Sequence, residues 1–227
     1  MLLLAIDTST TAITVALHDG ATVLAEATTL DARGHAEHLA PGIARVLGDA
    51  AREARQVTDV VCGLGPGPFT GLRVGVVTAR TLALAVGARL HGVCSLDALA
   101  HQAWRQGSVR DGVPLVVATD ARRKEVYWAR YAVSPSGTAR LTGPRVAAPA
   151  SVADELASAV VVGRGPRLHP AALGAGALPL DVSAAYLADL VVRRLASGEP
   201  LDGREPFYLR RPDAVPTAAR AERQGVG

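Results

Sequence analysis

The first thirty residues alternate short apolar runs with polar turns. Apolar runs occupy 2–6 and 13–17, and the second ends at "HDG", a hairpin signal that precedes the run 21–30. This spacing predicts three neighbouring antiparallel strands at the start of the chain.

Beyond residue 34 the apolar positions adopt a helical period. In "HAEHLAPGIARVLGDA" the apolar side chains of Leu39, Ile43 and Val46 share one face, and Pro41 is expected to kink the helix. The segments "TDVVCGL" and "ARLHGVCSL" are predicted strands, each followed by a predicted helix, the second of them capped by Ser95. The alternation predicts a mixed sheet with helices on its faces, ending near residue 105.

The second half begins like the first. "LLLAIDTSTTAITVAL" and "LVVATDARRKEVYWAR" both place an apolar strand before an aspartate, Asp7 or Asp120, and a second strand after a short turn. An internal duplication is favoured, and a chance match of two hairpins is the alternative. Further strands are expected at 140–147 and 160–162, and a helix at 184–195.

The predicted fold is therefore α/β, with two subdomains built from mixed sheets flanked by helices. The first is expected to span 1–105 and the second 106–227, with a frayed tail after about residue 212.

A duplicated meander with an aspartate at each first turn is typical of actin-like ATPases, in which the two turns face each other across a phosphate-binding cleft. The corresponding cleft residues here are Asp7, Thr8, Ser9 and Asp120. Backbone amides approach phosphate closely where side chains are absent, yet neither turn contains glycine. We expect a vestigial nucleotide cleft without catalysis.

The stretch "GLGPGPFTGLRVGVVTARTLALAVG" has a glycine-rich loop before a helix. It lacks the lysine of a phosphate-binding Walker loop, and its match to G-x-G-x-x-G has one residue too many. Small residues instead recur every four positions along the helix, and a second such stripe lies on the helix near residue 40. The two stripes either pack within the molecule or form an exposed helix pair that docks another subunit. The stripes comprise Gly71, Gly75, Ala79, Ala83 and Gly87, and Ala36, Ala40, Ala44 and Gly48.

Composition narrows the class of protein. The chain has 227 residues, 49% of them hydrophobic, which excludes an intrinsically disordered protein. No basic leader precedes Asp7, and no apolar run approaches the length of a membrane span, so we expect a cytoplasmic protein without membrane contact. Cys62 and Cys94 do not suggest a disulfide framework. The net charge of +3 is compatible with a nucleic-acid partner, but a codon bias toward arginine is the favoured explanation.

Six ordered motifs resemble the TsaB family, formerly called YeaZ: "AIDTS", "HAEHLAP", "GPGPFTGLRVG", "GVCSLDALA", "DARRKEVYWARY" and "FYLRRP". Pro68 departs from the family, which usually has serine there. The resemblance implies an actin-like, RNase H-like fold. It also implies a non-catalytic accessory subunit in the bacterial synthesis of threonylcarbamoyladenosine beside the anticodon of tRNA.

The family resembles a degenerate form of the catalytic subunit TsaD. Ser95 and Leu99 stand where that subunit has its metal-binding histidines, which implies a chain without metal or catalytic residues. The implied partners are a TsaD-type enzyme, a TsaE-type ATPase, tRNA through the complex, and a second copy when the chain is alone. No cofactor is expected, although ATP or ADP at the complex interface is compatible with the family. The expected partner interface comprises Ala36, Leu39, Ala40, Ile43, Ala44, Gly71, Leu72, Gly75, Ala79 and Ala83.

Several alternatives follow from single residues. His35 and His38 share a helical face and either hold a metal or lie solvated at a helix start. A stand-alone peptidase or an ATP hydrolase using Asp7 and Asp120 is the rival function, although no nucleophile elbow accompanies the serine and cysteine candidates Ser9, Ser95 and Cys94. Arg73 and Arg80 are expected to be exposed or paired with acidic groups. Tail arginines either contact tRNA or solubilise the tail: Arg204, Arg210, Arg211, Arg220 and Arg223.

Overall fold

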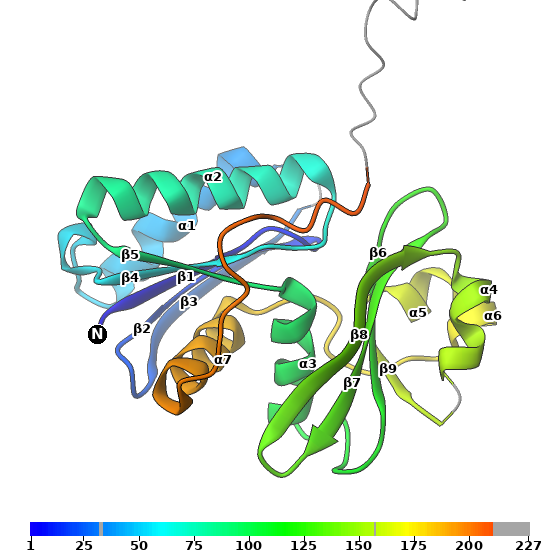
Figure 1. Ribbon diagram of the computed structural model, residues 1–227. Coiled ribbons are helices and arrows are strands. Elements are labelled where there is room, and N and C mark those ends of the chain that lie inside the picture. Colours follow the sequence, from blue (N-terminus) through cyan, green and yellow to red (C-terminus); the bar gives the residue numbers. More distant parts are fainter. Residues whose placement is uncertain (32–33, 157, 211–227) are drawn as a thin grey trace, which may run out of the picture.

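The computed structural model describes residues 1–31, 34–156 and 158–210, which form two sheets with helices packed around them (Figure 1). The first sheet has the strand order β3-β2-β1-β4-β5. Its first three strands are antiparallel neighbours, and β4 and β5 run parallel to β1. The predicted meander is confirmed. The five strands are β1 (Leu3–Asp7), β2 (Ala12–His18), β3 (Val23–Leu30), β4 (Asp59–Gly63) and β5 (Arg89–Val93).

The second sheet repeats this plan with the order β8-β7-β6-β9. Its strands β6, β7 and β8 are antiparallel neighbours, and β9 runs parallel to β6. The strands β3-β2-β1-β4 and β8-β7-β6-β9 thus have the same order and directions, as an internal duplication predicts, and the RNase H-like fold is confirmed. The strands are β6 (Leu115–Asp120), β7 (Val126–Ser134), β8 (Gly137–Ala147) and β9 (Val160–Val162).

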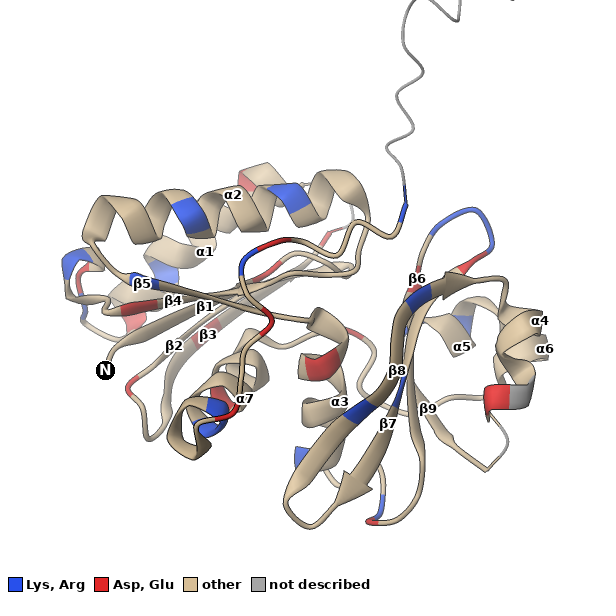
Figure 2. Cartoon of the chain, viewed as in Figure 1, with Lys and Arg blue, Asp and Glu red and all other residues tan. Residues whose placement is uncertain are grey.

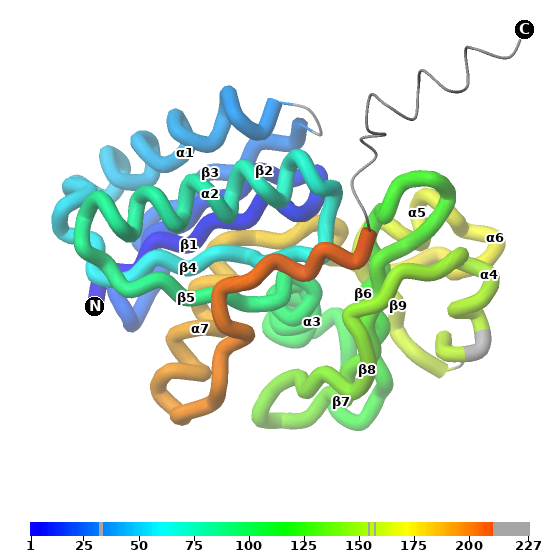
Figure 3. The backbone as a smooth tube through the Cα atoms, turned by 45° about the horizontal axis from the view of Figure 1, so that its top comes forward, coloured from blue at the N-terminus to red at the C-terminus, as the bar shows by residue number. Residues whose placement is uncertain are grey.

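Helices cover both faces of the first sheet (Figures 1 and 3). Helices α1 (His35–Asp49) and α2 (Phe69–Val86) lie on one face, and α7 (Ala184–Ser197) lies on the other. Strands β1 and β2 are therefore buried along their whole length, whereas the edge strand β3 is partly exposed. Gly87, with φ of 71°, ends α2 in the left-handed conformation that favours glycine.

Helix α3 (Ser95–Arg105) lies between the two sheets and joins their cores. One apolar cluster combines Leu3 of the first sheet, Leu99 of α3 and Leu115 of the second sheet. Helix α7 belongs to the second half of the chain but packs on the first sheet. The division near residue 105 thus stays a prediction, and α7 crosses it. Short helices complete the described chain: η1 (Ala54–Gln56), α4 (Pro149–Val152), η2 (Ala153–Leu156), α5 (Gly165–Leu168) and α6 (Pro170–Leu173).

The segment 199–210 crosses from the first sheet toward the second (Figure 3). The Asp202 amide donates to the Gly92 carbonyl at 3.1 Å, and the Phe207 amide donates to the Leu64 carbonyl at 2.9 Å. The Phe207 ring packs against the apolar clusters of both halves. The tail expected after residue 212, with Arg220 and Arg223, lies outside the described residues, and so does Arg211.

One helix among the described residues, α2, is long and apolar enough to cross a membrane, with 18 residues and a mean hydropathy of 1.4. Its length and hydropathy are closer to those of a membrane-spanning helix than the sequence analysis expected. Length and composition are weak evidence, because core helices pass the same test. A third of this helix is buried against the rest of the chain, 33% by residue.

Candidate functional site

Asp7 is fully buried and makes hydrogen bonds inside the chain. Its Oδ1 accepts from the Ser9 amide at 2.8 Å and the Ser9 hydroxyl at 2.7 Å, and its Oδ2 accepts from the Ser95 hydroxyl at 2.5 Å. Burial raises the pKa of this carboxyl. Asp7 thus ties the end of β1 to the start of α3. The prediction that Ser95 caps α3 is wrong, because Cys94 holds the cap position and the Ser95 hydroxyl bonds Asp7.

Thr8 points in another direction, into α2. Its hydroxyl donates to the Gly71 carbonyl at 2.7 Å and accepts from the Gly75 amide at 3.1 Å. A Cβ atom at Gly75 would lie 2.3 Å from Thr8 Oγ1, and one at Gly71 would lie 2.7 Å from His35 Nε2. The small residues of this stripe therefore leave room for the chain's own β1–β2 turn and the start of α1 to pack against α2.

The expected partner interface is wrong for six of its ten residues, because these are buried within this chain and a partner cannot reach them. The exposed side of the two helices carries the remaining four, of which Ile43 is half-buried. It also carries two large apolar residues that the stripe did not predict, Val77 at 51% and Leu84 at 86% exposure. The buried residues are Leu39, Gly71, Leu72, Gly75, Ala79 and Ala83, and the exposed ones are Ala36, Ala40 and Ala44.

The outer side of α2 also has a shallow, largely apolar groove lined by Phe69, Arg73, Val74 and Val77 together with two threonines. Along its whole length α2 carries two basic residues, Arg73 and Arg80, and no acidic one (Figure 2). As expected, Arg73 is exposed, above the Phe69 ring, while Arg80 pairs with Glu205 at 3.1 Å.

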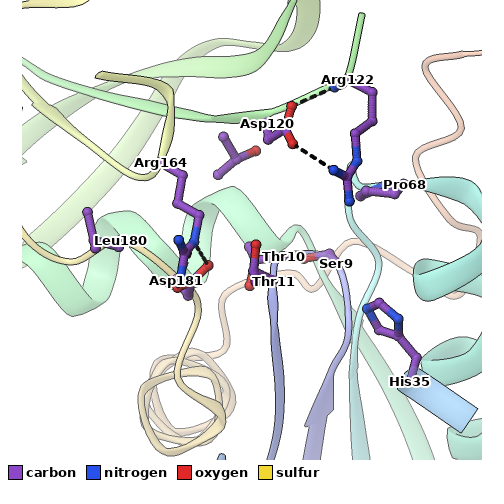
Figure 4. Close-up of a pocket in the computed structure, with 11 residues that line it drawn as sticks. Ser9, Thr10, Thr11, His35, Pro68, Asp120, Arg122, Arg164, Leu180 and Asp181 are labelled. Carbon is purple, nitrogen blue, oxygen red and sulfur yellow. Dashed lines mark hydrogen bonds and ion pairs between the residues drawn. The ribbon is translucent and has the colours of Figure 1, made fainter. Parts of the chain in front are cut away.

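A separate pocket lies where the first turns of the two sheets face each other (Figure 4). It is small, with room for about one water molecule. Of the four residues expected in the cleft, Ser9 and Asp120 line this pocket. Asp7 and Thr8 do not, because the Asp7 carboxylate bonds Ser9 and Ser95 and the Thr8 hydroxyl bonds the backbone of α2. The lining residues come from both turns, both helix starts and a later loop: Ser9, Thr10, Thr11, His35, Pro68, Thr119, Asp120, Arg122, Arg164, Leu180 and Asp181.

Two ion pairs dominate the pocket's electrostatics. Asp120 accepts from the Arg122 amide at 2.7 Å and lies 3.4 Å from its guanidinium. Arg164 forks onto Asp181 through Nε and Nη2, at 2.7 to 3.0 Å, and this contact raises the pKa of Arg164. His35, Arg164 and Asp181 were not predicted to join the turns. The glycines beside Arg164 were the one sequence signal that this loop packs closely on the second sheet, since a Cβ atom at Gly163 would lie 2.3 Å from the Ala118 carbonyl oxygen.

The glycine-rich loop before α2 packs against the first turn rather than surrounding an open site. A Cβ atom at Gly67 would lie 2.4 Å from the Ser9 carbonyl oxygen, and Gly65 has a φ of 78°. The Tyr127 hydroxyl donates to the Gly67 carbonyl at 3.4 Å. Glycine is therefore required here for close packing of backbone on backbone.

The histidine and cysteine candidates are dispersed. Among the residues that the structure describes, no group of three or more histidine, cysteine or acidic side chains is placed to hold a metal ion. His35 packs on Gly71, while His38 lies 3.3 Å from Asp31. Ser95 and Leu99, which the family resemblance led us to expect at the histidine positions of TsaD, are both buried.

The candidate nucleophiles are also engaged or inaccessible. The described hydrogen bonds of the Ser9 and Ser95 side chains go to Asp7 and to the Gly65 amide, and none joins an imidazole. Cys62 and Cys94 are free thiols whose pKa is raised by burial, which leaves both unreactive.

Comparison with known proteins identifies the family of this chain. The model of the family described as TsaD, tRNA N6-adenosine threonylcarbamoyltransferase, matches residues 22–183. An uncharacterized protein of Mycobacterium tuberculosis is 44% identical over 95% of this chain and 94% of its own length. The Escherichia coli tRNA threonylcarbamoyladenosine biosynthesis protein TsaB is 38% identical over 60% of this chain.

The chain spans only part of some relatives: 59% of a 41% identical Mycobacterium leprae protein and 58% of the E. coli protein. The solved structure of YeaZ from Pseudomonas aeruginosa superposes with a TM-score of 0.74 at 28% identity, covering 91% of this chain and all of that one. A second solved structure, of a protein with similarity to peptidase YeaZ from the same organism, has a TM-score of 0.76 and 30% identity, covering 92% of this chain and 99% of its own. Motifs, topology and these matches agree: the chain belongs to the TsaB family, formerly called YeaZ, within the wider family of TsaD.

Proposed function

We propose that this chain is an accessory subunit in the synthesis of N6-threonylcarbamoyladenosine beside the anticodon of tRNA. In this role it binds a TsaD-type catalytic subunit and holds it in an active arrangement. The family match and the name of the E. coli relative support the pathway. The role of the chain within the pathway rests on the surface of α1 and α2.

The observation that carries the proposal is the exposed apolar side of these two helices. Val77 and Leu84 are large apolar side chains with 51% and 86% of their surface exposed. Ala40 and Ala44 of α1 are exposed as well, and small side chains let another helix approach closely. Apolar residues gathered on an exposed face are typical of a protein interface. A homologous helix pair from the partner would complete a four-helix contact, and a second copy would use the same face in its absence.

We further propose that the chain has no catalytic activity of its own. The loss of both TsaD histidine positions to Ser95 and Leu99 supports this, and the burial of Asp7 argues against the rival ATP hydrolase. We assign the chain to the cytoplasm, with a TsaE-type ATPase joining the complex and tRNA held through the complex. It requires no cofactor, and any ATP or ADP would belong to the complex interface.

Depletion in the host tests the proposal. Threonylcarbamoyladenosine in total tRNA is measured by nucleoside mass spectrometry while the TsaD-type enzyme is kept at its normal level. The proposal predicts that the modification disappears and that the wild-type chain restores it. Val77→Glu should fail to restore it, whereas Leu141→Glu, a change at a residue on β8 with 59% exposure, should succeed. An unchanged level of the modification after depletion would overturn the proposal.

A further inference from the structure

The turn between β6 and β7 holds three exposed cations in an unusual backbone conformation. Arg122, Arg123 and Lys124 have φ of 61°, 50° and 61°. The Glu125 amide donates to the Arg122 carbonyl at 3.0 Å and closes a tight turn whose two central residues both have a positive φ. Asparagine and glycine are the usual residues at such positions. Backbone strain of this kind is concentrated at functional sites, so the cations of this turn are candidates for binding a partner.

The end of segment 199–210 lies against this turn. The Arg210 guanidinium contacts the Glu125 carboxylate, and the Tyr208 ring lies 5.3 Å from the Phe69 ring of α2, centroid to centroid. The basic positions of the turn and of the segment lie on the α2 side of the molecule (Figure 2). We call this exposed surface the basic strip. It comprises Arg122, Arg123, Lys124, Arg204, Tyr208 and Arg210, and it is bordered by Phe69, Arg73 and Arg80 of α2.

Positive charge is concentrated in this part of the chain. The turn 120–125, the segment 203–210 and helix α2 together contain seven arginine and lysine residues and three acidic ones. This excess of four positive charges is larger than the net charge of +3 of the whole chain. Among the described residues, no ion pair engages Arg73, Lys124 or Arg204, so their charges are not neutralised within the chain. The three acidic residues are already paired, Asp120 with Arg122, Glu125 with Arg210 and Glu205 with Arg80.

The strip is too long for a single phosphate group. Arg80 donates to the Arg204 carbonyl, whereas Phe69, against which Tyr208 packs, lies eleven residues earlier in the same helix. At a rise of 1.5 Å per residue, these two contacts are about 16 Å apart along α2. Phosphates along one nucleic-acid strand are about 3.4 Å apart in axial rise. A polymer with repeated negative charges can therefore reach several cations of the strip at once, which a mononucleotide cannot do.

An aromatic ring between the cations favours nucleic acid over an acidic protein. Tyr208 is 47% exposed and lies between Arg204 and Arg210 in the sequence. Cations along a surface with interleaved aromatic rings are typical of proteins that bind single-stranded nucleic acid, because the rings stack on bases while the cations contact phosphates.

We propose that the basic strip binds the phosphate backbone of an unpaired stretch of RNA, with a base stacked on Tyr208. The sequence left open if the arginines near the carboxyl end contact RNA or solubilise the tail, and the proposal assigns Arg204 and Arg210 to RNA contact. The choice of RNA rather than DNA rests on the proposed function in tRNA modification. The strip itself is distinct from the apolar partner surface around Val77 and Leu84.

Fluorescence anisotropy of a labelled, unmodified tRNA transcript titrated with the full chain tests the proposal at several salt concentrations. We expect saturable binding that weakens as the salt concentration rises. Unlabelled transcript should displace the probe, whereas ATP and a poly-glutamate of similar net charge should displace it at least about tenfold less effectively, because neither supplies both a chain of phosphates and bases.

Three variants locate the binding. Lys124→Asn removes a charge and suits the positive φ, so it should lower the slope of log affinity against log salt by about one. Adding Arg204→Gln to it should weaken binding by about tenfold, and Tyr208→Ala should weaken it by at least about fivefold. The matched control is Arg110→Gln, which removes an exposed cation from the loop before β6, at the other end of that strand from the turn, and should leave the affinity and the slope unchanged.

Thermal unfolding establishes that each variant is folded, and the two charge variants decide if Tyr208→Ala is not. No binding of the transcript, equally effective displacement by ATP or by poly-glutamate, or an equal loss in Arg110→Gln would overturn the proposal. Displacement by poly-glutamate would point instead to an acidic protein partner. Binding of the TsaD-type subunit is measured separately with Val77→Glu, so failure of RNA binding would leave the proposed accessory role standing.

Discussion

The hydroxyl of Thr8 lies between two backbone groups of α2, accepting from the Gly75 amide at 3.1 Å and donating to the Gly71 carbonyl at 2.7 Å. These groups are four residues apart and would bond each other in a regular helix. A side chain from the β1–β2 turn thus enters the hydrogen-bond ladder of the helix. The same turn supplies Ser9 and Thr10 to the pocket, so the pocket wall and the proposed partner helix are joined through one residue.

Replacing Thr8 by valine should destabilise the fold. Valine has nearly the same shape but no hydroxyl, so both backbone groups lose this partner in a buried place. We expect the free energy of unfolding to fall by roughly 1–3 kcal/mol. Urea denaturation measures the change, and Thr8→Ser, which keeps the hydroxyl, is the control. Equal stability of Thr8→Val and the wild-type chain would contradict this account of the contact.

Two glycines on neighbouring helices should respond to alanine with opposite signs. At Gly75 a Cβ atom would lie 2.3 Å from Thr8 Oγ1, and at Gly48 of α1 it would meet nothing within 4 Å. Gly75→Ala should therefore cost roughly 1–3 kcal/mol through overpacking. Gly48→Ala should stabilise the chain by up to about 1 kcal/mol through helix propensity. Thermal unfolding of the two variants in parallel checks the prediction, which fails if both shift the midpoint in the same direction.

Most strands and helices could be predicted because their period lies in the local sequence. The duplication was visible for the same reason, since Asp7 and Asp120 end equivalent strands. The small residues on α2 do form a closely packed surface, as predicted, but their spacing does not specify which part of a protein packs against them. Here the neighbour of Gly75 is Thr8, 67 residues away in sequence. Arg164 reaches the pocket because its loop packs there in the tertiary structure, and the local hydrophobic pattern gives no information about that packing.

Acidification should weaken the fold through His101. This residue is 2% exposed, its Nε2 lies 2.7 Å from Asp189 Oδ2, and burial lowers its pKa. The unfolded chain therefore binds a proton more readily than the native chain. The stabilising contribution is present above the unfolded pKa of about 6.5 and is lost as the pH falls below it.

The size of this effect is bounded by one proton, at about 1.4 kcal/mol per pH unit. Burial also lowers the pKa of His18, which adds a contribution of the same sign. Urea unfolding between pH 7.5 and 5.5 should show stability falling with pH, and His101→Gln should reduce the slope. A slope unchanged in this variant would show that His101 does not carry the effect.

A charge on the outer side of α2 should abolish partner binding without unfolding the chain. Val77 is 51% exposed, so glutamate there is solvated in the free chain but would be buried against an apolar partner face. We expect Val77→Glu to keep its thermal midpoint and to weaken binding of the purified TsaD-type subunit by at least about tenfold. Calorimetry of the complex measures this, with Leu141→Glu as the control. Undiminished binding by a folded Val77→Glu would place the interface elsewhere.

Reconstitution with purified components tests whether the chain activates a TsaD-type enzyme through α1 and α2. The purified enzyme, a TsaE-type ATPase, threonylcarbamoyl adenylate and unmodified tRNA are combined with and without this chain, and formation of the modified nucleoside is followed by mass spectrometry. We expect rapid formation of the modified nucleoside with the wild-type chain, and little without it or with Val77→Glu. Equal rates with and without the chain would show that it does not activate the enzyme.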